Sequence, residues 1–257
     1  MVKWRLVVKT LPWMALVLAL SYVRRFVLDI PPLAEFDDIG AVLTAAALII
    51  GFMLAGVIGD YKESEKLPGE LAATLETFDD AIVAGSRASG RFDPRAFRQR
   101  YHAATGAVVE WFMNRGTVAT CYEALRDLNT LIADLERAGL GAVFVTRCLT
   151  EQHNLRKLVT RIEVIRRTKF IPAGYALVQM FVITTMVLLI FSGFRNWQVQ
   201  FLITGTLSLI YLYLLRIIRD LDDPFEYAAG YVEEGSADVS PHPILDYHAR
   251  LKADLAQ

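Results

Sequence analysis

Four long apolar segments constrain this chain more than any other feature of its sequence. Each is rich in Leu, Ile, Val, Ala and Phe, and they cover residues 11–28, 39–59, 171–191 and 198–215. A helix rises about 1.5 Å per residue, so about 20 residues cross a hydrocarbon layer about 30 Å thick. Unpaired backbone N–H and C=O groups are too costly in lipid for irregular segments to cross it. We therefore expect four transmembrane helices in contact with a lipid bilayer.

Composition and charge narrow the class of function. Hydrophobic residues make up 54% of the 257 residues, above the roughly 45–50% of soluble domains. The net charge of −1 gives no basic excess, so we expect no nucleic-acid partner. The two cysteines, Cys121 and Cys148, do not form a CxxC pair and are expected to be free thiols. No phosphate-binding loop, nucleophile with a paired base or metal-ligand cluster is recognisable, so we expect no enzyme, no metal and no cofactor.

The positively charged side chains are distributed unevenly around the apolar segments. The loop 29–38 contains four acidic residues and no Lys or Arg, whereas residues 61–170 contain 17 Lys and Arg. Lys and Arg that flank transmembrane helices stay preferentially on the cytoplasmic side. We therefore expect both termini and residues 61–170 in the cytoplasm, with two short loops outside.

The residues between the second and third apolar segments show helical spacing. Apolar positions in 69–84 recur every three or four residues, and 95–114, 118–138 and 143–168 indicate further helices. No alternating strand pattern occurs. We predict an all-α, four-transmembrane-helix protein whose long helices extend into a cytoplasmic helical domain. The predicted parts are residues 1–60 (N-terminal transmembrane pair), 61–170 (cytoplasmic helical domain), 171–219 (C-terminal transmembrane pair) and 220–257 (cytoplasmic tail, loosely ordered after Tyr231).

Three short motifs, in this order and spacing, resemble the bestrophin superfamily, especially its bacterial members. The first runs from Ile50-Gly51-Phe52 to Asp60-Tyr61-Lys62-Glu63 and is similar to the end of the second bestrophin helix. The second, 166–175, contains Pro172 and Tyr175 and is similar to the start of the third helix. The third, Asp222-Asp223-Pro224-Phe225, is similar to the acidic-Pro-Phe motif after the last helix. The resemblance covers about residues 5 to 245.

The resemblance implies a bestrophin-like ion channel of the bacterial inner membrane. Bestrophins are homopentamers, often anion-selective, with a pore lined by the second helix. Small inorganic ions would permeate passively, with anions favoured, and the lining would include Thr44, Leu48 and Phe52. These residues recur every four positions and share one helix face. The same spacing also fits an ordinary interface between membrane helices, which is the alternative interpretation of these three side chains.

Arg24 and Arg25 interrupt the first apolar segment. A central Arg costs about 2.5–3.5 kcal/mol on insertion scales, so we expect both near the outer interface, with their heads in the polar layer. There they either anchor the helix or attract anions at the outer mouth of the pore.

Two features depart from the bestrophin pattern, and the first of them favours a second hypothesis. The run 53–58 is wholly apolar where bestrophins place polar groups. This run favours a non-conducting membrane scaffold or stress-response protein that retains the architecture. The calcium-binding acidic run of animal members is also sparse here, with Glu226, Glu233 and Glu234 nearby. Asp220, Asp222, Asp223 and Glu226 carry enough charge for a hard cation, but we interpret them as a solvated helix end.

Overall fold

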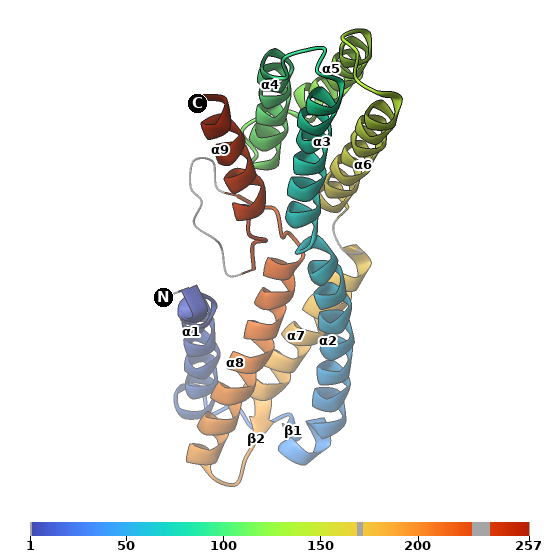
Figure 1. The fold of residues 1–257 in the computed structure, drawn as a ribbon. Helices are drawn as coiled ribbons and strands as arrows, with labels where there is room; N and C mark the ends of the chain where they lie inside the picture. The colour runs from blue at the N-terminus through green and yellow to red at the C-terminus, as the bar shows by residue number, and fades with distance from the viewer. Residues whose placement is uncertain (1, 169–171, 228–236, 257) are drawn as a thin grey trace. The chain divides into compact units, whose positions relative to one another are not determined.

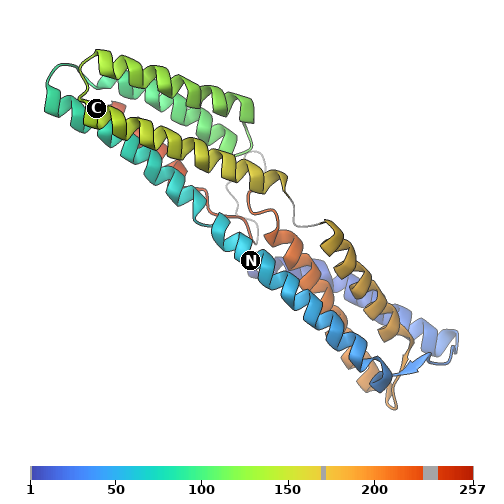
Figure 2. The same cartoon turned by 90° about the vertical axis from the view of Figure 1, so that its right-hand side faces the viewer.

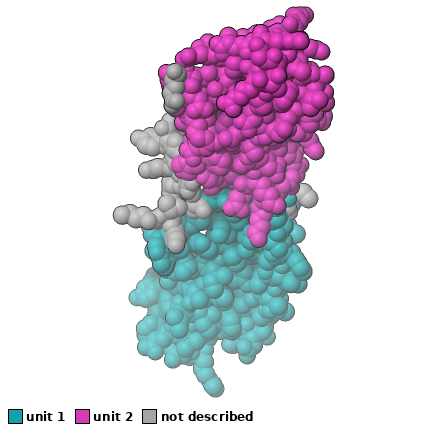
Figure 3. Space-filling view, viewed as in Figure 1, with its two compact units in different colours: residues 1–61, 169–224, 235–237 teal, residues 62–168, 225–234, 238–257 magenta. Residues whose placement is uncertain are grey.

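The computed structural model describes residues 2–168, 172–227 and 237–256. Two compact units divide the chain, and Figure 3 shows each in its own colour. Unit 1 consists of residues 1–61, 169–224 and 235–237. Unit 2 consists of residues 62–168, 225–234 and 238–257. The first change of unit, between Tyr61 and Lys62, falls one residue from the predicted end of the N-terminal transmembrane pair.

Unit 1 is built from the apolar helices and the short turns between them. Figure 1 shows α1, α8, α7 and α2 side by side within this unit. The bounds of its elements are α1 Val2–Tyr22, the π-helix η1 Val23–Val27, β1 Ala34–Glu35, α2 Phe36–Ser64, α7 Pro172–Phe191, β2 Ser192–Gly193 and α8 Trp197–Leu221.

The four predicted transmembrane helices are confirmed by length and composition. Within the described residues, the helical segments long and apolar enough to cross a membrane are Leu6–Val27, Phe36–Ser89, Ala173–Phe191 and Trp197–Leu221. Only 22–33% of the residues in each apolar window are buried within the chain. Most of their apolar surface must therefore face lipid or another copy of the chain, because exposing it to water is unfavourable.

The core of unit 1 is one face of α2 packed against α7 and α8. Tyr211 of α8 joins this core, and its hydroxyl donates to the Leu43 carbonyl at 2.7 Å. The alternating spacing of three and four residues keeps the buried α2 positions on one face of the helix. Those α2 residues are Ile39, Leu43, Ala46, Ile50, Met53 and Val57.

A two-residue parallel bridge joins the two loops of unit 1. Ala34 pairs with Ser192, and Glu35 pairs with Gly193. A Cβ on Gly193 would come within 2.9 Å of the Pro32 side chain, so the close approach of the loops requires glycine. Two residues are too few to show a strand period, so this bridge was not predictable from the sequence pattern.

Unit 2 is a helical bundle. Its elements are α3 Leu67–Ser89, α4 Arg95–Phe112, α5 Val118–Arg137, α6 Ala142–Arg167 and α9 His242–Ala256. Figures 1 and 2 show α3 to α6 running alongside one another. The helices predicted over 95–114, 118–138 and 143–168 are confirmed within two residues at each end. At the start of α5, the Thr117 hydroxyl accepts from the Thr120 N–H at 3.1 Å and caps the helix.

The predicted loose tail is wrong for residues 242–256, which form α9. Ile244, Tyr247 and Leu251 are buried on one face of this helix, and the Tyr247 hydroxyl donates to the Leu75 carbonyl of α3 at 3.2 Å. The prolines at 241 and 243 indicated a loop, but proline is well tolerated in the first turn of a helix. The predicted start of the loose region, at Tyr231, lies outside the described residues.

Candidate functional site

The second apolar helix, α2, has one buried face and one open face. Thr44, Leu48 and Phe52 lie on the open face, where Leu48 is 57% and Phe52 71% exposed. The four-residue spacing predicted that these three residues share a face, and the structure places all three away from the core of unit 1. The Thr44 hydroxyl donates to the Gly40 carbonyl of the same helix at 2.9 Å.

Glycines leave room along the same helix. A Cβ added at Gly40, Gly51 or Gly59 would meet no atom within 4 Å. Small residues of this kind let a second helix backbone approach closely, or leave a lumen open. No charged residue occurs from residue 39 to residue 59, so the open face carries no fixed charge along this length.

The apolar run 53–58 is divided between the two faces of α2. Met53 and Val57 are buried in the core of unit 1. Ala55, Gly56 and Ile58 are exposed. The open face therefore carries only two small residues and one larger apolar residue from this run, because the helical period turns the bulky Met53 and Val57 inward.

Arg24 and Arg25 have different surroundings in η1. The Arg25 guanidinium donates to Gln200 Oε1 at 2.6 Å, and Gln200 in turn donates to the Ser192 carbonyl at 3.3 Å. Arg24 is only 4% exposed, so most of its side chain is covered by other residues of unit 1. Its Nε and Nη1 have no acceptor among the described residues.

The sequence did not indicate that these arginines share a cavity with residues far along the chain. The cavity has a volume of about 660 Å³ and is also lined by Arg195, which follows β2. Asp29 and Glu35, from the loop before α2, line it as well. The only sequence signal was Arg195 itself, a cation in a loop otherwise expected outside the membrane.

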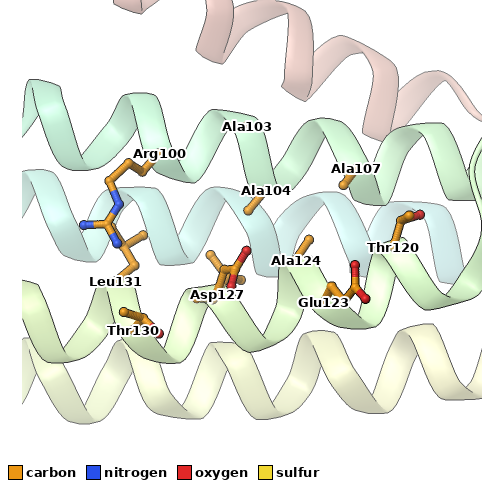
Figure 4. Close-up of a pocket in the computed structure, with 11 residues that line it drawn as sticks. Arg100, Ala103, Ala104, Ala107, Thr120, Glu123, Ala124, Asp127, Thr130 and Leu131 are labelled. Atoms are coloured by element: carbon orange, nitrogen blue, oxygen red, sulfur yellow. The ribbon is translucent and has the colours of Figure 1, made fainter.

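A smaller groove of about 440 Å³ lies between α4 and α5 in unit 2. Figure 4 shows Ala103, Ala104 and Ala107 along one side of it and Glu123 and Asp127 along the other. The small alanine side chains leave the space unfilled. Neither His nor Cys lines the groove, so it lacks the usual pairing of a thiol or hydroxyl with an imidazole base.

The other candidate reactive or metal-binding side chains are either buried or far apart. Cys121 and Cys148 are free and buried, and burial raises the pKa of each thiol to about 12. Both thiols therefore stay protonated and unreactive at neutral pH. Among the residues that the structure describes, no three His, Cys, Asp or Glu converge to hold a metal ion. Glu233, Glu234 and residues 169–171 of the second motif lie outside them.

Comparison with known proteins gives a match of fold. The sequence matches no protein-family model and no curated protein. A crystal structure of a mutant bacterial Bestrophin homolog from Klebsiella pneumoniae matches 99% of this chain and 98% of its own, with a TM-score of 0.74 and 16% identity. A second structure of that homolog, solved by Zn-SAD phasing, has a TM-score of 0.68 and 16% identity over 97% of this chain and 99% of its own.

A third crystal structure, described as a mutant of a membrane protein, has a TM-score of 0.76 and 14% identity over 98% of both chains. The agreement extends over nearly the whole length of this chain and of its structural relatives. The predicted all-α bestrophin fold is confirmed.

Proposed function

We propose that this chain, a membrane protein with the bestrophin fold, is a bestrophin-like ion channel of the bacterial inner membrane. Small inorganic ions would cross passively through a central pore of a homopentamer, with α2 lining the pore in each copy. The observation that carries the proposal is the open face of α2, where Leu48 and Phe52 are exposed and no charge is present. Apolar rings of this kind can gate a pore by dewetting.

The uneven charge supports an orientation with both termini and residues 61–170 in the cytoplasm. The 17 Lys and Arg of that region and the acidic loop 29–38 follow the positive-inside rule. Anion permeation is the selectivity that we propose, by analogy with bestrophins in general. Since the open face of α2 supplies no fixed charge, selectivity would depend on groups at the two mouths of the pore.

The experiment is current recording from the purified full chain in planar bilayers. We expect currents whose reversal potential in a KCl gradient follows chloride. Phe52→Ala and Leu48→Ala should increase the conductance several-fold, because each removes a bulky apolar side chain from the lumen. Ile183→Ala and Leu202→Ala are matched controls, since both residues are exposed apolar positions on α7 and α8, and they should leave the conductance unchanged.

The second candidate is a non-conducting membrane scaffold or stress-response protein, which the apolar run 53–58 favours. It predicts no current from correctly assembled protein and no effect of the Phe52 and Leu48 substitutions. If all four variants change the current equally, the exposed α2 face is not the lining of the pore.

A further inference from the structure

The cavity beside η1 has the size and the lining of a ligand site. Its volume of about 660 Å³ lies within the range of about 300–1,000 Å³ that is typical of small-molecule sites. Arginines from two distant parts of the chain, 24–25 and 195, meet in it, and so do Asp29 and Glu35. The parallel bridge between β1 and β2 holds these segments together.

Two of the three arginines in this cavity form no ion pair within the described parts of the chain. Arg24 is 4% exposed, and its Nε and Nη1 have no acceptor there. Arg195 is exposed and is absent from the hydrogen bonds and ion pairs of the described residues. Burying an unpaired guanidinium is costly, so Arg24 indicates an anionic group that completes the site. Phosphate suits this role because guanidinium groups bind it bidentately.

The two carboxylates of the cavity are also free to pair with a ligand. Asp29 and Glu35 line it, yet neither forms an ion pair with a described arginine, and their side chains have no hydrogen bond there. A simple anion would be repelled by them. A ligand with a phosphate at one end and an ammonium at the other would pair with both sets of charges.

Exposed aromatic rings extend from the cavity across the surface of unit 1. Phe26 lines the cavity and packs edge-on against Trp197, with centroids 6.2 Å apart. Tyr22 lies 5.0 Å from Phe26, and all three rings are at least half exposed. Aromatic residues of this kind collect where a membrane meets water. A ligand in this cavity would thus have its polar end among the charges and its apolar end along the rings.

We propose that this cavity binds the headgroup of a phospholipid whose phosphodiester carries a primary ammonium group, as in phosphatidylethanolamine. The phosphodiester lies against Arg24 and Arg195, and the ammonium faces Asp29 and Glu35. The acyl chains follow Tyr22, Phe26 and Trp197. The site requires a membrane fold but no ion conduction, so it stands or falls separately from the channel.

The test is native mass spectrometry of the delipidated full chain, mixed with equal amounts of phosphatidylethanolamine, phosphatidylglycerol and phosphatidylcholine. We expect phosphatidylethanolamine to be retained in preference to the other two. Arg195→Ala should reduce its retention about tenfold, because a hydrogen bond to a charged group contributes about 1.5 kcal/mol. Arg219→Ala, which removes an exposed arginine elsewhere in unit 1, should have no effect. Since Arg195 is exposed, neither substitution should change the unfolding temperature.

A double variant, Asp29→Asn with Glu35→Gln, tests the ammonium half of the site. It should abolish the preference for phosphatidylethanolamine over phosphatidylglycerol. Soluble glycerophosphoethanolamine and inorganic phosphate separate a lipid from a free anion, and neither should compete at the lipid's concentration. Equal retention of all three lipids by the native chain, no loss in Arg195→Ala, or equal binding of the soluble compounds would each overturn the proposal.

Discussion

At the scale of single residues, one ion pair inside unit 2 differs from the others on its surface. Arg98 of α4 donates to Asp79 of α3 through both Nε and Nη2, at 2.8 and 2.7 Å. The Asp79 side chain is only 9% exposed. Glu76, three residues earlier, pairs with Arg250 at 3.0 Å, but both side chains are about half exposed. Burial makes the first pair the more costly one to break.

We predict that Asp79→Ala lowers the free energy of unfolding of unit 2 by about 2–4 kcal/mol, since it leaves Arg98 half-buried with only the exposed Asp254 nearby. Glu76→Ala is the matched control and should cost at most about 1 kcal/mol. Chemical denaturation in detergent, followed by the circular dichroism of the full chain, measures both. Equal losses in the two variants would show that the buried pair contributes no more than the surface one.

Sequence reasoning about the site succeeded where a residue's position follows from its own helix. The four-residue spacing of Thr44, Leu48 and Phe52 fixed their shared face, and the structure places that face outward. It did not predict the burial of Arg24, which lies in a turn of π-helix and lines a cavity together with a residue about 170 positions away. No local pattern indicates such contacts. Whether the α2 face lines a pore stays a prediction.

At the scale of elements, one of the contacts between α9 and α4 is a pair of stacked histidines. The rings of His102 and His248 lie 4.4 Å apart with an interplanar angle of 11°. His248 Nδ1 is also within hydrogen-bond distance of the Thr105 hydroxyl, at 3.2 Å. Burial lowers the pKa of both histidines, and the nearby Lys252 lowers them further. For His248, Glu110 acts in the opposite direction.

These shifts make the attachment of α9 dependent on pH. The ordinary pKa of histidine is about 6.5. Because the folded-state pKa is lower, the unfolded chain binds more protons than the folded chain at pH values between the two. The stability is fully present above about pH 6.5 and is lost as the pH falls through the lower, folded pKa values. We predict that amide exchange in α9, corrected for its intrinsic rate, is several-fold faster at pH 5 than at pH 7.5.

The variant His102→Phe tests whether the histidine pair causes this pH dependence. Phenylalanine keeps a flat ring beside His248, and His102 Nε2 has no partner among the described residues that the change would remove. The variant should retain less of the pH dependence while α5 and α6 exchange as in the native chain. Exchange in α9 that is equally protected at both pH values would contradict the role of the histidine pair.

Sequence reasoning predicted the long helices of unit 2 well and its last helix poorly. In α4, α5 and α6 the apolar period runs over 18 to 26 residues, enough to stand out from the polar positions. In α9 the 15-residue helix buries only Ile244, Tyr247 and Leu251. Three buried positions are too few to identify a helix face from the sequence. They can be recognised only when the surfaces of α3 and α4 against which they pack are known.

At the scale of the whole molecule, one copy of the chain leaves the apolar surface of its helices largely uncovered. At most a third of each apolar window is buried within the chain, and α2 exposes Leu48 and Phe52. Lipid can cover α1, α7 and α8. A central pore, in contrast, requires the α2 helices of several copies to face one another.

We predict that the purified chain assembles as a pentamer, with a protein mass five times the 28.8 kDa of one copy. Light scattering coupled to gel filtration, corrected for bound detergent, measures this mass. A single copy has too few helices to surround a pore. A mass of one or two copies that persists in mild detergent and in lipid nanodiscs would therefore exclude a pore between copies.

The place of α9 in unit 2 also has a consequence for biosynthesis. Residues 242–256 pack against α3 and α4, which the ribosome releases before α7 and α8 are made. Unit 2 therefore cannot finish folding until every apolar helix has been synthesised. An assembly that requires a complete unit 2 could therefore begin only after residue 256 has been made.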